Sequence, residues 1–170
     1  SLVTNTGNVI VDASGKLIVN GAGITGGTVT DNGEIDLTGS AVLSGGILKN
    51  NAALNVSGTG NALDAETITN AGIIEVLASG ALTVGQGTTV DDATGSIVVD
   101  DGALLTLQGA TISGGAINNY SALGGTIDVT ADSRIDSNAT LSKGAVTVES
   151  GVTLTLDDAT VAGATITNLG

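Results

Sequence analysis

The sequence predicts an all-β fold, a single-stranded parallel β-solenoid in which short strands wind into stacked coils. Three observations predict it. Apolar residues recur two positions apart, Gly and Asn recur between these pairs, and the combined pattern returns about every 20 residues along the whole chain. An α-helical fold is disfavoured, because the apolar residues do not follow a helical period and because Gly, Thr, Asn and Val are weak helix formers.

The composition suits a chain in which nearly every segment is paired on both sides. Apolar residues make up 41% of the 170 residues, but the only aromatic is Tyr120, and there is no Phe, Trp or Met. The core must therefore consist of Val, Ile, Leu and Ala, most of which pack well on pleated surfaces. The chain has 27 Gly and no Pro, a residue that interrupts hydrogen bonding inside a sheet. Disorder is excluded, because disordered segments are poor in apolar residues.

The clearest internal repeat relates residues 96–119 to residues 145–168. Ile97 aligns with Val146 and Leu105 with Leu154, each pair 49 residues apart. Inside this unit, an apolar pair such as Ile97 and Val99 is followed eight residues later by a second pair. Alternation with period two is the signature of a strand with one face inside. The first pair of each predicted coil begins at Val9, Ile35, Leu54, Ile74, Ile97, Ile127 and Val146.

These starting points are 19 to 30 residues apart and predict about seven coils of roughly 19–30 residues. One such coil cannot bury its own apolar row, whereas stacked coils bury a continuous core. Parallel strands are almost always connected with a right-handed crossover, so we expect a right-handed solenoid.

The predicted corners are rich in Gly and in the motif Asn-x-Gly. This motif occurs at residues 5–7, 70–72 and 168–170, and shortened or altered versions begin at Asn32 and Asn50. Both Gly and Asn tolerate positive φ, so we expect them to turn the chain sharply at these positions.

Threonine lies between inward residues in the second predicted strand of several coils, at Thr83, Thr106 and Thr155. The simplest interpretation is a row of good strand formers. An ice-binding surface is a weaker alternative, because it would need regular Thr-x-Thr rows on one flat face, and these strands read Leu-Thr-Val and Leu-Thr-Leu.

The charges exclude several classes of partner. The chain has 17 acidic and 4 basic residues and a net charge of −13, which argues against nucleic acids and anionic membranes. No apolar run approaches the ~20 residues needed to cross a bilayer. We therefore expect no nucleic-acid partner and no membrane insertion of this segment.

The residue types also argue against an enzyme. With no His and no Cys, no His-based triad, His-based zinc site or thiolate nucleophile can form. A polysaccharide-active enzyme with a β-helix fold is a remote alternative, disfavoured by the scarcity of basic and aromatic residues. The sequence therefore predicts no catalytic, cofactor-binding or metal-binding residues and no cofactor.

A weak calcium site is the one alternative to an absence of cofactors. It would use the adjacent acidic pairs, since calcium takes six to eight oxygen ligands. The simpler interpretation is that these acids are solvated turn residues, and Tyr120 is expected to be a partly exposed corner residue. The pairs are Asp91-Asp92, Asp100-Asp101 and Asp157-Asp158.

Coils of about 19–23 residues, Asn-x-Gly corners, Gly-Gly steps and Ile-x-Val strands resemble the passenger regions of bacterial autotransporters. They are also similar to filamentous-haemagglutinin-like adhesins. The resemblance covers the whole chain but rests on low-complexity motifs. It implies export, a secreted or cell-surface location, and a role in adhesion or self-association.

Residues 1–170 are expected to form a single solenoid segment, as a fragment or a subunit of a longer repeat array. Residues 3–7 match residues 166–170, so the chain begins and ends at the same phase of the coil. We therefore expect a non-enzymatic structural or adhesive protein whose partners are further copies of itself, or a host or bacterial surface. The alternative is a fibre or spacer subunit that stacks end to end and binds no receptor.

Overall fold

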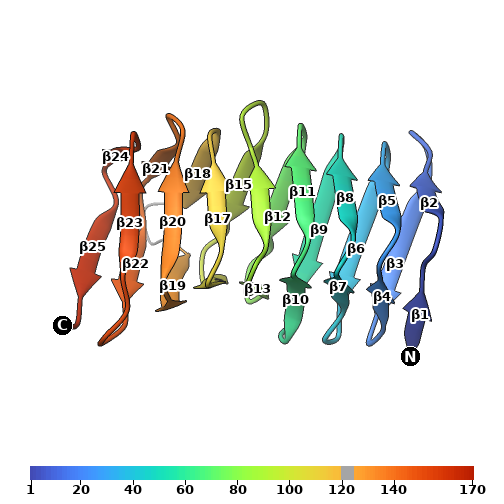
Figure 1. Ribbon diagram of the computed structural model, residues 1–170, viewed down its shortest axis with the longest axis horizontal. Helices are drawn as coiled ribbons and strands as arrows, with labels where there is room; N and C mark the ends of the chain where they lie inside the picture. Colours follow the sequence, from blue (N-terminus) through green and yellow to red (C-terminus); the bar gives the residue numbers. More distant parts are fainter. Residues whose placement is uncertain (120–124) are drawn as a thin grey trace.

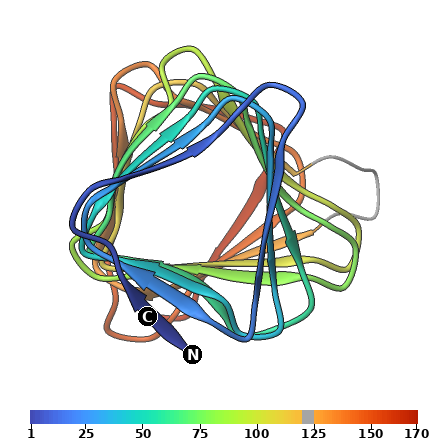
Figure 2. The same cartoon turned by 90° about the vertical axis from the view of Figure 1, so that its right-hand side faces the viewer.

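The computed structural model describes residues 1–119 and 125–170, and it confirms the predicted parallel β-solenoid. Its described residues form strands and turns and no helix, and they make about eight turns, one more than expected. The strands of successive turns lie side by side along the long axis (Figure 1). Seen from the N-terminal end, the chain winds clockwise as it recedes, so the solenoid is right-handed (Figure 2).

Each turn contributes one strand to each of three parallel sheets. Sheet A contains β1 (Leu2–Thr4), β4 (Gly23–Thr25), β7 (Val42–Ser44), β10 (Asn61–Asp64), β13 (Ala81–Val84), β16 (Leu104–Gln108), β19 (Thr126–Ala131), β22 (Ala145–Val148) and β25 (Thr165–Asn168). Sheet B contains β2 (Asn8–Val11), β5 (Thr28–Asp31), β8 (Ile47–Asn50), β11 (Thr67–Asn70), β14 (Thr89–Asp91), β17 (Thr111–Ser113), β20 (Ser133–Asp136) and β23 (Leu154–Asp157). Sheet C contains β3 (Lys16–Asn20), β6 (Glu34–Thr38), β9 (Ala53–Ser57), β12 (Ile73–Val76), β15 (Ser96–Val99), β18 (Ala116–Asn119), β21 (Thr140–Ser142) and β24 (Thr160–Ala162).

The register between turns places equivalent side chains above one another. The shortest turn separates Lys16 from its partner Glu34 by 18 residues, and the longest separates Ala116 from Thr140 by 24. Alternation along each strand then sends every second side chain into the interior. The inner side chains stack into continuous columns, and in sheet C one column consists of Leu17, Ile35, Leu54, Ile74, Ile97, Ile117 and Leu141. From Ile35 to Leu141 this column is 0–2% exposed.

The predicted first strands of the coils do not all lie on one face, which corrects the coil assignment. Val9 lies in sheet B, Ile35 and Ile97 lie in sheet C, and Ile127 and Val146 lie in sheet A. The strands that contain Ile97 and Val146, β15 and β22, are seven strands apart along the chain. With three strands in each turn, this separation is two full turns plus one strand, so the two strands lie in different sheets. The sequence repeat therefore identifies similar strand pairs but not the face on which they lie, because all three faces have the same apolar alternation.

Two of the three Asn-x-Gly corners form for a different reason from the one expected, whereas the expected positive φ occurs in the third, at Gly170, with a φ of 99°. Neither Asn5 nor Asn70, and neither Gly7 nor Gly72, has a positive φ. Gly72 is required by a close approach, since an added Cβ would lie 2.0 Å from the carbonyl oxygen of Ala52. The expected positive φ does occur at the Gly pairs 26–27 and 114–115.

Truncation of one inner side chain should cost far more stability than truncation of its outward neighbour. Leu105 is 0% exposed, and Leu105→Ala should lower the free energy of unfolding by about 2–5 kcal/mol, because it leaves a cavity in a closed column. Thr106→Ala, one residue later on the outer face, should change it by no more than about 0.5 kcal/mol. Urea denaturation followed by circular dichroism measures both; equal losses would contradict the assignment of inner and outer faces.

Two of the Asn-x-Gly motifs, those that end at Gly7 and Gly72, give a matched test of the corner geometry. Gly72→Ala should destabilise the chain by about 1–3 kcal/mol, because the new methyl group overlaps the backbone of the preceding turn. Gly7→Ala meets nothing within 4 Å, so it should be neutral or stabilising by up to about 1 kcal/mol. Thermal unfolding of the two variants compares them directly, and a neutral Gly72→Ala would refute the close approach.

Candidate functional site

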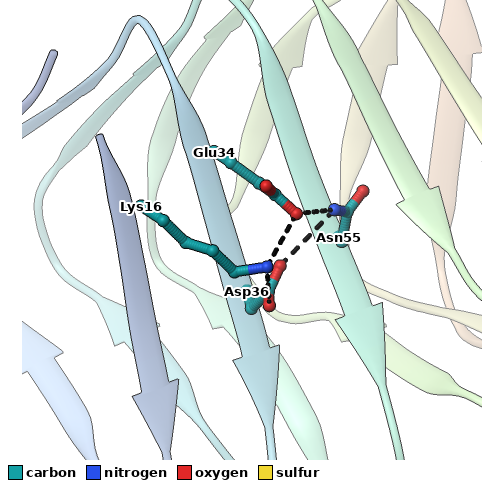
Figure 3. Close-up of polar contacts among 4 residues, drawn as sticks. All are labelled: Lys16, Glu34, Asp36 and Asn55. Atoms are coloured by element: carbon teal, nitrogen blue, oxygen red, sulfur yellow. Dashed lines mark hydrogen bonds and ion pairs between the residues drawn. The ribbon is translucent and has the colours of Figure 1, made fainter. Parts of the chain in front are cut away.

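Polar side chains form one network on the outer face of sheet C, near the N-terminal end (Figure 3). The Lys16 ammonium lies 2.9 Å from Glu34 Oε1 and 2.7 Å from Asp36 Oδ2. Asn55 on the next strand donates to the same Glu34 oxygen at 2.8 Å. The hydrogen bond to Asp36, then that to Glu34, raises the pKa of Lys16. Because this ammonium is exposed, solvent screens the pair and its contribution to stability is small.

The same outer row interleaves like charges with a neutral residue. Asn55 lies in register between Asp36 and Glu75, so the two carboxylates are not direct neighbours. Direct opposition of like charges would destabilise adjacent strands. The network is thus explained by sheet stability.

A second ionic group lies on sheet B near the C-terminal end. Arg134 Nε donates to Asp136 Oδ2 at 2.6 Å, and its Nη2 pairs with Asp157 on the following turn. The guanidinium holds the pKa of Asp136 below its usual range. Arg134 thus links two strands that would otherwise bring acidic side chains together.

Threonine rows occur on sheet B, which the sequence did not indicate. Thr28 with Thr30, and Thr67 with Thr69, are outward Thr-x-Thr pairs. The intervening strand carries Ile47 and Lys49 at the same positions, so the row is interrupted. Of the threonines singled out from the sequence, Thr83 and Thr106 are register partners in sheet A, whereas Thr155 lies in sheet B beside Arg134. The described strands of sheet B therefore lack the regular array on their outer face that ice binding would need.

A buried polar column lies inside the corner between sheets B and C. Asp31, Asn50, Asn70 and Asp92 follow one another in successive turns, and each is 0–1% exposed. Asn50 Nδ2 donates to Asn70 Oδ1 at 2.7 Å, and Asn70 Nδ2 donates to Asp92 Oδ1 at 2.6 Å. The signal in the sequence was the Asn-x-Gly motif, but we interpreted it as turn chemistry and so missed that the Asn side chain points into the core.

Other buried polar side chains form hydrogen bonds with backbone groups. Glu66 Oε1 accepts the Gly46 N–H at 3.1 Å, and burial raises the pKa of Glu66. Asn61 Oδ1 accepts the Ala41 N–H at 3.0 Å, and its amide group donates to the carbonyl of Ser57 at 3.0 Å. These side chains satisfy backbone groups that the turns leave free.

The adjacent acidic pairs do not converge on one site. Asp91 is exposed on the outer face of sheet B, whereas its neighbour Asp92 is inside, so this pair points in opposite directions. Asp157 is paired with Arg134, and Asp158 follows with a φ of 53°. Within residues 1–119 and 125–170, no three acidic side chains are placed to hold a metal ion. The expectation for Tyr120 lies outside the described residues.

Strand edges are open at both ends of residues 1–170. The outer sides of β1, β2 and β3 have no partner strand, and neither do those of β23, β24 and β25. The columns are uncovered there, so Val3 is 52% and Ile166 is 39% exposed. At the C-terminal end the open core forms a hollow lined by Val148, Val152, Thr153, Leu154, Leu156, Ile166 and Asn168.

Comparison with known proteins identifies no relative. The described part of the chain contains no helix that is long and apolar enough to cross a membrane. The chain matches no protein-family model, no curated protein and no solved structure.

Proposed function

We propose that the chain is a rigid, non-enzymatic segment of a secreted or cell-surface bacterial protein, with a structural and adhesive role based on self-association. One observation carries the proposal. Three parallel sheets run through the described chain from end to end, and each ends in a strand whose outer edge has no partner strand.

Rigidity follows from the way each turn is held. Every interior strand has hydrogen-bonded partners in the turns before and after it, as β9 does with β6 and β12. Eight turns at about 4.8 Å each make a rod about 38 Å long. Such a rod suits a spacer or a stalk that holds other parts of a protein at a fixed distance.

The two ends are complementary. All strands within a sheet are parallel, so β23 and β24 of one copy offer β2 and β3 of another the same pairing that joins consecutive turns, while in sheet A β25 and β1 compete for one place. The Asn-x-Gly motifs at the two ends also form the same local hydrogen bond. The Gly7 N–H donates to Asn5 Oδ1 at 3.0 Å, and the Gly170 N–H donates to Asn168 Oδ1 at 3.0 Å. Open edges of this kind readily pair with another chain. In a longer polypeptide, further turns would cover the same edges.

The side chains support self-association more than recognition of a receptor. Binding hot spots are rich in Trp, Tyr and Arg. On the lateral faces, by contrast, the large exposed apolar side chains of the described residues are aliphatic and separate, such as Ile47 and Ile73. This observation favours the spacer or fibre alternative for the lateral faces. The secreted location rests on the resemblance to bacterial passenger regions.

The isolated chain should associate end to end in a concentration-dependent way. Sedimentation velocity over a range of concentrations should show growing species, and electron microscopy should show rods of constant width. Ile166→Lys places a charge in the open column of the last turn and should weaken association at least tenfold, because an unpaired buried charge is costly.

Ile73→Lys is the matched control, since Ile73 is 45% exposed on the side of the rod. It should leave end-to-end association unchanged. A chain that stays monomeric at every concentration would contradict self-association, and disruption by Ile73→Lys alone would indicate lateral association instead.

The strand count gives a second test of end-to-end association. The described chain has eight turns plus one strand, so β25 of one copy and β1 of the next require the same place in sheet A. Removal of residues 1–7 eliminates that competition and should lower the concentration at which filaments form. A higher threshold would contradict stacking in continuous register.

A further inference from the structure

The buried polar column has acceptors that lack donors. Its internal hydrogen bonds all run in one direction, from Asn50 to Asn70 and from Asn70 to Asp92. Three oxygens in the column are nevertheless buried without a partner, namely Asp31 Oδ2, Asn50 Oδ1 and Asp92 Oδ2. A buried acceptor without a donor is unfavourable, so each of these oxygens needs an explanation.

The first two unpaired oxygens belong to register partners. Asp31 in β5 pairs with Asn50 in β8. The Asn50 amide nitrogen donates its two hydrogens to Asn70 Oδ1 and to the Ile73 carbonyl oxygen. The Asn50 side-chain oxygen is therefore the atom that remains to interact with Asp31. If Asp31 were ionised, two acceptors would be neighbours with no hydrogen between them. A proton on Asp31 Oδ2 supplies the missing donor and continues the direction of the column.

The third unpaired oxygen, Asp92 Oδ2, would also gain a hydrogen-bond partner if it carried a proton. Asn50 and Asn70 each donate a second hydrogen to a backbone carbonyl of the next strand in sheet C, that of Ile73 at 3.0 Å and that of Ser96 at 3.1 Å. Ile73 and Ser96 are register partners, and the partner that follows them is Ala116. A proton on Asp92 Oδ2 would let Asp92 donate to the Ala116 carbonyl in the same series.

We propose that Asp31–Asn50–Asn70–Asp92 is a hydrogen-bond ladder completed at each end by a proton on an aspartic acid, and that this protonated form is the most stable form of the solenoid. The ladder is thus a proton-binding element inside the core, and it makes the rod more stable in mildly acidic than in alkaline solution.

The surroundings of the two carboxyl groups support the proposal. Burial raises the pKa of Asp31, and it raises the pKa of Asp92 to about 7 against the opposing effect of the Asn70 hydrogen bond. Glu34 on β6 and Asp91 on β14 raise these pKa values further. The other charged groups nearby, Asp12 at the facing corner and Lys49 on the outer face of β8, are exposed and belong to no salt bridge of the described residues.

Backbone packs directly against the Asp92 carboxyl. A Cβ added at Gly115 would lie 2.3 Å from Asp92 Oδ2, and one added at Gly95 would lie 2.8 Å from Asp92 Oδ1. Glycine is therefore needed at both positions, because any side chain there would overlap the Asp92 carboxyl group.

The sign of the pH dependence follows from the raised pKa values. Below about pH 3.9, the usual pKa of Asp, the folded and unfolded chains are both protonated and the ladder contributes fully. As the pH rises, the unfolded chain loses its protons first, so stability falls until the folded groups also ionise, at a pH of about 7 for Asp92. Above that pH the contribution of Asp92 is lost.

Asn substitutions imitate the protonated acid and test the proposal. At pH 8, Asp92→Asn should lower the unfolding equilibrium constant at least tenfold, and Asp31→Asn should lower it too, because Asn supplies the hydrogen without a charge. At pH 4.5 both effects should shrink. Asp91→Asn is the matched control, since it removes one negative charge from the adjacent, exposed position. It removes only the smallest of the influences that shift the pKa of Asp92 and leaves burial in place, so most of the pH dependence of the parent chain should be retained.

Urea denaturation at the two pH values measures these effects. Equal shifts for Asp92→Asn and Asp91→Asn would overturn the proposal, because they would reflect net charge alone. Carboxyl ¹³C NMR titration of the unmodified chain gives a readout that does not depend on any variant. Asp92 should titrate near pH 7, and titration of both Asp31 and Asp92 below pH 4.5 would refute a protonated ladder.

Discussion

Hydrogen bonding between successive turns, in constant register, is the interaction on which the rest of this structure depends. It places each residue above an equivalent residue 18 to 24 positions earlier. Each side chain must therefore pack against the equivalent side chains of the turns before and after it, as well as suit its own strand. Inside, this requirement favours Val, Ile and Leu, whose shapes stack without gaps. Outside, it favours opposite or neutral neighbours, as in the row in which Asn55 separates Asp36 from Glu75.

The same constraint produces the buried ladder and the open ends. A polar residue in an inner column is favoured where its neighbours above and below can share its hydrogen bonds, and Asp31, Asn50, Asn70 and Asp92 accordingly occupy one column. Asn is suited to the middle of such a column because it both donates and accepts. Likewise, the backbone N–H and C=O groups at the edge of a sheet have hydrogen-bond partners only where another turn follows.

The fold class could be predicted from the sequence because period-two alternation and regular corners are local signals. The face on which each strand lies could not be predicted, since the strands of Ile97 and Val146 have the same alternation but lie in different sheets. The alternation does indicate that Asp36, Asn55 and Glu75 face outward, and they share one row because their three strands follow one another at nearly constant spacing. The ladder was missed because the sequence does not indicate whether a corner Asn turns outward or inward, which depends on the register with the neighbouring turns.

The most direct test of the account is the distance between labelled residues in one outer row. Lys49 and Asp157 are exposed and lie five turns apart in the same row of sheet B. Spin labels on cysteines introduced at these positions, measured by double electron–electron resonance, should give one narrow distribution near 24 Å, from about 4.8 Å per turn. A broad distribution, or a maximum displaced by more than two turns, would contradict stacking in constant register.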